Sequence, residues 1–174
     1  MKSKWILRVK VSDNDNELVE LYKKQIEKHM DMIKNNKYPD SGFDVFCPSN
    51  WNEKKTKLVN TNIQCSLYKK VTYDCGVSEV PSAYYMYARS SIYKTSYRLA
   101  NNVGIIDSGY RGVLKAAMDP KRSNVENEEF VPLEKGKRYW QLCTPTLEPF
   151  DEVLLVSDLG ETVRGSGGHG STGL

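Results

Sequence analysis

Short apolar segments replace helical periodicity from residue 41 onward, and this feature constrains the fold more than any other. Over residues 57–68, KLVNTNIQCSLY, apolar residues alternate with polar ones, as in a strand with one buried face. Further short strands, separated by Pro, Gly, Asn and Asp, are predicted at 83–90, 113–118, 138–143 and 152–156. Many short strands at this spacing are typical of a sandwich or jelly roll, so the sequence predicts an all-β domain.

The first 40 residues differ from the rest because they predict one strand and one convincing helix. Residues 5–12, WILRVKVS, alternate enough for a strand. Asn14 and Glu17 resemble a capping box at the start of the helix. The expected apolar face of that helix consists of Val19, Tyr22, Ile26, Met30 and Ile33. His29 lies near the edge of this face, where we expect it to be exposed or half-buried and not a metal ligand.

Composition excludes several classes of function. The 174 residues fit one domain, and a net charge of +3 spread along the chain is too weak to predict nucleic-acid binding. The four cysteines form no C-x-x-C pair, so no zinc site is expected. We also expect no membrane span and no signal peptide, because the apolar runs are short and broken. The expected location is therefore cytoplasmic or nuclear rather than secreted.

The ten residues VGIIDSGYRG, from Val103 to Gly112, combine a strand, an acid and a tight turn. Asp107 directly follows the apolar strand and precedes Ser108-Gly109. Two β-branched segments around a Gly-containing turn predict a hairpin whose tip holds the acid in a cleft.

Five segments in this order resemble the five motifs of the homotrimeric dUTPases. The segments are 41–44 (SGFD), 88–91 (ARSS), 101–112 (NNVGIIDSGYRG), 136–142 (GKRYWQL) and 164–173 (RGSGGHGSTG). The resemblance implies a dUTPase-like distorted jelly roll, or β-clip barrel, with an added N-terminal strand and helix. It divides the chain into an extension (1–40), a β domain (41–163) and a flexible glycine-rich arm (164–174).

The implied reaction is the hydrolysis of dUTP to dUMP and pyrophosphate with Mg²⁺, which keeps uracil out of DNA and supplies dUMP for dTMP synthesis. By resemblance, Asp107 is the base that orients water for attack on the α-phosphorus. Tyr110 packs under the deoxyribose and excludes a ribose 2′-hydroxyl. Asn101 reads the edge of uracil, together with the hairpin backbone at Gly104 and Ile106.

The phosphate ligands come from other motifs. The resemblance assigns Arg89, Ser90 and Ser91 to the phosphate chain, and Gln141 donates to it from another strand. Asp44 supports Mg²⁺ through the water shell of the ion, while the three phosphates supply most of its ligands, because Mg²⁺ sheds water reluctantly.

The arm completes the implied site. Arg164 can pair bidentately with the terminal phosphate, and the backbone N–H groups around the glycines can wrap phosphate. The expected substrate-binding residues of the arm are Arg164, Gly168, His169, Gly170 and Ser171. In the family this arm crosses to a neighbouring subunit, so the resemblance implies a homotrimer with shared active sites.

Four departures from the family pattern are expected to affect the fine tuning of the site rather than the reaction. Ala88 replaces a proline, Ser91 a glycine, Val113 a polar or acidic residue, and His169 a phenylalanine that stacks on uracil. Two alternatives remain open. A dCTP deaminase shares this fold but needs an acid near Ala117, and a non-catalytic dUTPase-like interaction module would lack catalysis altogether.

Overall fold

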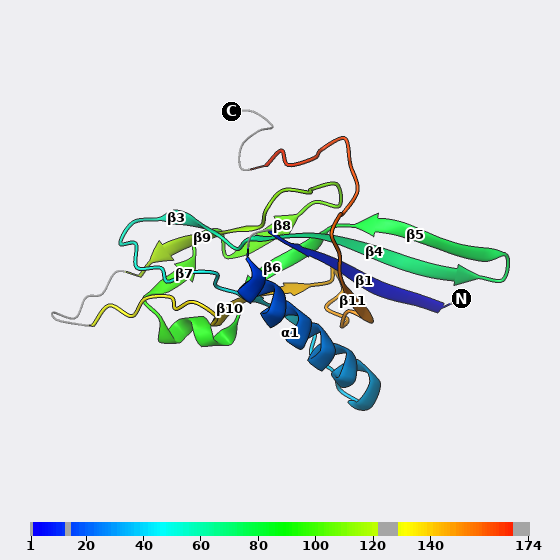
Figure 1. Cartoon of the computed structure of the whole chain (residues 1–174), viewed down its shortest axis with the longest axis horizontal. Helices are drawn as coiled ribbons and strands as arrows, with labels where there is room; N and C mark the ends of the chain where they lie inside the picture. The colour runs from blue at the N-terminus through cyan, green and yellow to red at the C-terminus, as the bar shows by residue number, and fades with distance from the viewer. Residues whose placement is uncertain (1, 13–14, 122–128, 169–174) are drawn as a thin grey trace.

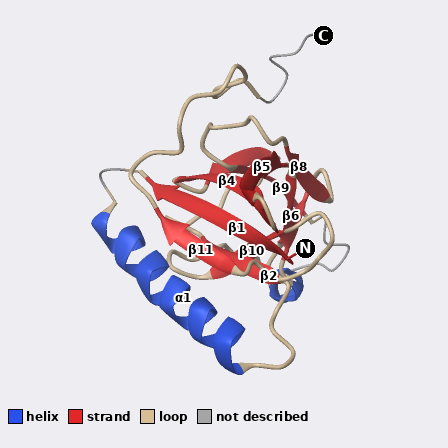
Figure 2. Cartoon of the chain, turned by 90° about the vertical axis from the view of Figure 1, so that its right-hand side faces the viewer, coloured by secondary structure: helices blue, strands red, loops and turns tan. Residues whose placement is uncertain are grey.

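The computed structural model of the chain describes residues 2–12, 15–121 and 129–168. Helix α1 (Asn16–Asn35) lies along one side of a body built from short strands (Figures 1 and 2). The other elements, in chain order, are β1 (Lys2–Val11), β2 (Gly42–Phe46), β3 (Lys57–Asn60), β4 (Ile63–Tyr73), β5 (Gly76–Ser82), β6 (Tyr84–Ala88), the 3₁₀ helix η1 (Ser90–Lys94), β7 (Tyr97–Leu99), β8 (Val103–Ile106), β9 (Lys115–Pro120), β10 (Arg138–Cys143) and β11 (Glu152–Leu155). The prediction of an all-β fold with an added helix is confirmed.

The described strands form three small sheets. Their orders are β11-β1-β4-β5, β2-β10-β6-β8 and β3-β9-β7. Neighbouring strands are antiparallel except β1 and β11, which run parallel. The core between these sheets contains large aromatic side chains, and Trp140 on β10 is fully buried with its indole N–H 3.3 Å from the sulfur of Met118. The polar end of this tryptophan is therefore satisfied inside the core.

Strand β1 is an integral part of a sheet, because it lies between β4 and β11. Ile6 and Leu7 are both buried, and successive strand residues point to opposite faces, so both faces of β1 are covered here. The segment predicted as an N-terminal addition thus contributes a central strand.

Helix α1 begins one residue later than predicted. Its N-cap is Asp15, whose side chain accepts a hydrogen bond of 3.1 Å from the Leu18 amide. Asn14, expected as the cap, lies outside the described residues. An acidic or amide side chain satisfies the free amides at a helix start equally well, so the sequence alone could not choose between the two neighbours.

The buried face of α1 is also rotated from the predicted one. Leu18, Tyr22 and His29 are buried, whereas the other members of the predicted face are only half-buried. His29 is 5% exposed, and its Nε2 lies 2.7 Å from the carbonyl oxygen of Phe150. The expectation of an exposed or half-buried histidine was therefore wrong, because this carbonyl gives the imidazole a partner inside the core.

We expect Asp15→Ala to lower the free energy of unfolding by about 1 kcal/mol, since it removes the cap of α1. Asp15→Asn keeps a side-chain acceptor at the same position and should behave like the wild type. Urea unfolding followed by circular dichroism measures both variants. Equal midpoints for Asp15→Ala and the wild type would contradict this account of the helix start.

The single strand predicted over residues 57–68 is interrupted. It forms β3 and β4, which belong to different sheets. Asn62 adopts a positive φ of 58°, and its amide donates to the side chain of Asn60 at 2.9 Å. Asparagine tolerates this left-handed conformation better than most residues, so the two asparagines make a turn where alternation alone predicts continuity.

The turn after β8 is confirmed, but the hairpin is not. The Tyr110 amide donates to the Asp107 carbonyl at 3.0 Å and closes a tight turn. Strand β8 then pairs with β6, whereas β9 pairs with β3 and β7. The chain therefore passes from one sheet to another at this turn, and Asp107 lies at the junction.

No helix in the described part of the chain is both long and apolar enough to cross a bilayer.

Candidate active site

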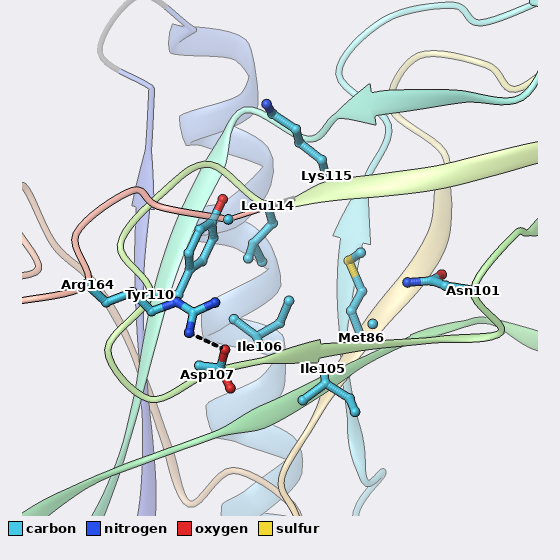
Figure 3. A pocket seen from close by; sticks show the side chains of 11 residues that line it. Met86, Asn101, Ile105, Ile106, Asp107, Tyr110, Leu114, Lys115 and Arg164 are labelled. Carbon is cyan, nitrogen blue, oxygen red and sulfur yellow. Dashed lines mark ion pairs between the residues drawn. The ribbon is translucent and has the colours of Figure 1, made fainter. Parts of the chain in front are cut away.

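A cavity of about 180 Å³ opens beside β8 and the following turn (Figure 3). Its lining consists of Met86, Asn101, Gly104, Ile105, Ile106, Asp107, Tyr110, Leu114, Lys115, Arg164 and Gly168. Seven of these residues were predicted for the site from sequence: Asn101, Gly104, Ile106, Asp107, Tyr110, Arg164 and Gly168. The structure thus gathers the predicted base and sugar contacts, together with the start of the arm, around one small cavity.

Asp107 faces this cavity from the start of the turn. One of its carboxylate oxygens lies 2.8 Å from Nη1 of Arg164 (Figure 3). Both side chains remain partly exposed, at 50% for Asp107 and 40% for Arg164. The carboxylate is therefore reachable from solvent and lies beside a guanidinium.

Tyr110 forms a buried wall of the same cavity. It is 9% exposed, and its hydroxyl donates to the Val113 carbonyl at 3.0 Å. Burial raises the pKa of Tyr110, and Arg164 opposes part of that rise. The phenol therefore stays neutral at physiological pH and presents an apolar ring.

Two glycines allow this ring to sit where it does. A Cβ added at Gly168 would lie 2.9 Å from Cε2 of Tyr110, and one added at Gly112 would overlap the same ring. Contacts this short essentially do not occur for real side chains. Glycine is therefore needed at both positions because the ring packs directly on the backbone.

The arm approaches the turn of its own chain. The Thr162 hydroxyl donates to the Gly109 carbonyl, and the Arg111 amide donates to the Gly165 carbonyl at 2.7 Å. Figure 1 shows this orange and red segment passing over the turn that follows β8. The predicted contacts His169, Gly170 and Ser171 lie outside the described residues.

A second group of predicted residues lines a different cavity, of about 630 Å³. Asp44, Arg89, Ser90 and Gln141 all contribute to it. The Asp44 carboxylate binds two guanidinium groups, with Nε of Arg89 at 2.7 Å and Nη1 of Arg138 at 3.0 Å. This group therefore presents cations, a hydroxyl and an amide, which is the donor set that phosphate oxygens require.

The charge on Asp44 reflects opposing effects. Burial raises the pKa of this carboxyl, while Arg89 and Arg138 act in the opposite direction. Because the two ion pairs are short and direct, we assign the ionised form to Asp44 at neutral pH. Ser91, the remaining predicted phosphate contact, lines a neighbouring cavity of about 500 Å³ together with Arg89.

Sequence reasoning missed Arg138 as a member of this group. In a regular strand its side chain would point away from the face that carries Gln141, since the two are three residues apart. The pairing of β10 with β2 shifts register between Arg138 and Trp140. Such a bulge redirects the side chain, so Arg138 reaches Asp44 despite the alternation. The sequence signal that could have indicated Arg138 was its position within the GKRYWQL segment.

The two groups lie at opposite ends and on opposite faces of one sheet. Tyr84 pairs with Ile106 and Tyr87 with Val103, so Asp107 and Arg89 extend from opposite ends of the β6–β8 pair. Arg89 lies five positions after Tyr84, which corresponds to roughly 17 Å along a strand. Gln141 pairs with Tyr87, on the face opposite to the one where Met86 pairs with Gly104. One chain therefore does not bring both groups to the same small ligand.

The sequence is similar to that of known proteins of one kind. No family model matches the sequence. The deoxyuridine 5′-triphosphate nucleotidohydrolase of Escherichia phage T5 is 36% identical over 110 residues, which cover 60% of this chain and 70% of that protein. The chain belongs to the dUTPase family.

Other relatives match over a shorter stretch. Proteins of the same name from Corynebacterium jeikeium and Rickettsia canadensis are 39% and 40% identical over 83 residues, which cover 47% of this chain and 51% of each relative. The matched part thus spans about half the length of these bacterial dUTPases. A solved Staphylococcus bacteriophage 80alpha dUTPase with dUpNHpp has a TM-score of 0.48 and 20% identity, covering 97% of this chain and 98% of that one.

This dUTPase-family chain has no acid at the position where the deaminase alternative needs one. Position 117 is an alanine on β9, and its carbonyl accepts from the Ala100 amide at 2.8 Å. Ala117 does not line the cavity beside β8. Among the described residues that line this cavity, Asp107 supplies the carboxylate. Position 117 therefore does not supply the acid that the deaminase alternative would require there.

Proposed function

We propose that this chain hydrolyses dUTP to dUMP and pyrophosphate. The observation that carries the proposal is the cavity beside β8, where Asn101, Gly104, Ile106, Asp107 and Tyr110 meet in about 180 Å³. The relatives from Escherichia phage T5 and Corynebacterium jeikeium are named deoxyuridine 5′-triphosphate nucleotidohydrolases. Such hydrolysis would keep uracil out of DNA and supply dUMP for dTMP synthesis.

The small cavity accounts for the choice of base and sugar. Uracil would insert along β8, where the backbone at Gly104 and Ile106 and the amide of Asn101 read its polar edge. The buried ring of Tyr110 would lie under the deoxyribose and leave no room for a 2′-hydroxyl. A slot that pairs polar groups and excludes extra atoms discriminates more strongly than an apolar pocket does.

Asp107 would act as the base. A water oriented by its carboxylate attacks the α-phosphorus and gives up a proton, the bond from that phosphorus to the bridging oxygen breaks, and pyrophosphate leaves. In the structure the same carboxylate is paired with Arg164. Substrate phosphate would compete for Arg164 and draw it away, which frees Asp107 for the water.

The residues of the proposed site fit a Mg²⁺ ion that the phosphates of the substrate would hold. The described residues contain no group of three or more His, Cys, Asp or Glu side chains suited to a metal. A carboxylate has about four acceptor positions, and the ion pairs of Asp44 to Arg89 and Arg138 leave others for water. Asp44 would therefore contact the water shell of the ion. When bound, Mg²⁺ would neutralise charge on the phosphates.

We further propose a homotrimer in which each active site draws on more than one chain. Two observations support this arrangement. Asp107 and Arg89 extend from opposite ends of the β6–β8 pair, and Gln141 lies on the sheet face opposite to that of Gly104. A triphosphate on the Asp107 side would then meet Arg89, Ser90 and Gln141 of a neighbouring chain.

An uncovered sheet face also supports association. On β8, Ile105 is 69% exposed, and it pairs with Tyr85 of β6. The Tyr85 and Tyr87 rings lie 5.7 Å apart, and Leu147 is 52% exposed at the edge of the adjoining cavity. Apolar side chains gathered next to the phosphate-binding group are typical of a surface that another chain covers.

We expect the chain to hydrolyse dUTP at least about 100-fold more efficiently than dTTP, because the slot has no space for the thymine methyl group. Pyrophosphate release with each nucleotide measures kcat/KM, and light scattering after gel filtration gives the mass in solution. Equal hydrolysis of both nucleotides by a monomer would contradict the proposal. Ammonia release from dCTP would support the deaminase alternative, and binding of dUTP without hydrolysis would support the interaction module.

A further inference from the structure

Arg111 is a buried guanidinium that contacts three separate parts of the chain. It is 9% exposed, and its Nη1 donates to the carbonyls of Ser108 at 3.0 Å and Tyr110 at 2.9 Å. Its Nε donates to the carbonyl of Leu159 at 3.3 Å, and Nη2 donates to the hydroxyl of Tyr68 at 3.2 Å. The turn, the segment leading into the arm and strand β4 therefore meet at one side chain.

This arrangement is unusual for a charged group. Within the described ranges, no carboxylate lies within ion-pair distance of Arg111, so carbonyl oxygens and one phenol hydroxyl replace its water shell. Burying a charge without an opposite charge is costly unless its hydrogen bonds are well satisfied. The planar fork of a guanidinium holds its donors in several fixed directions at once, so these contacts fix the groups that accept them.

The backbone strengthens the same junction. The Arg111 amide donates to the Gly165 carbonyl at 2.7 Å, and its own carbonyl accepts from the Gln64 side chain. The Thr162 hydroxyl, two residues before the arm, donates to the Gly109 carbonyl within the turn. Residues 162–165 are thus joined to the turn at Gly109 and again at Arg111.

We infer that Arg111 is a positioning residue that locks residues 159–165 to the turn of Asp107. Its side chain binds the carbonyl of Ser108, which follows Asp107, and the carbonyl of Leu159 in the segment leading into the arm. Its backbone amide binds the carbonyl of Gly165, which follows Arg164. Arg111 thereby sets the place from which Arg164 reaches the cavity and, when a triphosphate is present, its terminal phosphate. The nucleotide part of this inference rests on the proposed function, whereas the coupling of arm and turn does not.

The coupling itself is tested without any nucleotide. In Arg111→Lys and Arg111→Gln we expect the amides of Gly165 and Gly167 to exchange hydrogen at least about 10-fold faster than in the wild type. Tyr68→Phe removes the contact that involves neither arm nor turn, and it keeps the ring under Arg8, so it should exchange like the wild type. Unchanged exchange in folded Arg111→Lys, or equal acceleration in Tyr68→Phe, would overturn the inference.

The wild type supplies a test that needs no variant to fold. If arm and turn open together, the amides of Arg111 and Gly165 should show protection factors within about threefold of each other. An arm that exchanges freely while the turn stays protected would overturn the inference.

The nucleotide readout separates positioning from a general structural role. Titration calorimetry with dUpNHpp and with dUMP gives the ratio of the two affinities, and only the triphosphate analogue reaches Arg164. We expect Arg111→Lys to reduce this ratio at least about 10-fold with little change for dUMP. Equal weakening of both ligands would overturn the positioning role. If the wild type binds neither ligand, the proposed function fails, while the exchange experiments still decide whether Arg111 couples arm and turn.

Discussion

Asp107→Asn is expected to slow pyrophosphate release from dUTP by about 10³-fold while binding persists. The amide has nearly the same shape and can still accept a hydrogen bond from Arg164, which lies 2.8 Å from the native carboxylate. It is not basic, however, and cannot take a proton from the attacking water. A single-turnover assay of pyrophosphate release measures the rate, and calorimetry with dUpNHpp measures the binding.

Asp74→Asn is the matched control for this experiment. Asp74 is exposed in the turn between β4 and β5, so the same chemical change there should leave turnover intact. Turnover of Asp107→Asn within a few-fold of the wild type would show that another group activates the water.

Arg89→Ala is expected to reduce kcat/KM for dUTP by about 10²- to 10³-fold, because one charged donor to the phosphates is lost. Binding of deoxyuridine, which has no phosphate, should change little, since Arg89 lines a cavity separate from the one beside β8. Steady-state kinetics and calorimetry measure the two effects. Asp44 keeps its partner Arg138 in this variant, at 3.0 Å, so its charge is not left unpaired.

Arg98→Ala serves as the control for Arg89. This arginine pairs with Asp119 at 2.9 Å and is 69% exposed, outside both groups of site residues. Its removal should leave kcat/KM unchanged. An equal loss in both arginine variants would mean that net charge, rather than the position of Arg89, accounts for the effect.

The sequence predicts those parts of the fold that depend on local pattern. The strand expected at 138–143 has the observed bounds of β10, and the helix is present in its predicted region. Strand β5, GVSEVPS, was missed because it lies exposed beside β4 and shows no alternation of buried and exposed residues. A strand held by its neighbour's backbone carries little signal in its own side chains.

The candidate site likewise contains residues that local sequence predicts and contacts that it does not. The segment that carries Asn101, Gly104, Asp107 and Tyr110 is continuous in sequence, so its residues could be predicted together and are found together. The two ion pairs of Asp44 could not be predicted, because they join residues far apart in the chain and the pair with Arg138 also depends on a bulge in β10. The pairing of β8 with β6 rather than β9 likewise depends on contacts that local pattern does not encode.

In the proposed homotrimer, Asp107 and Arg89 act on one substrate from different chains. Co-expression of Asp107→Asn and Arg89→Ala chains, with different tags for isolating mixed oligomers, tests it most directly. If sites are shared around a trimer, each mixed trimer keeps both native groups at about one of its three sites. We therefore predict that the isolated mixed trimers recover about one third of the wild-type activity, far above either variant alone. Mixed oligomers no more active than the separate variants would contradict the account.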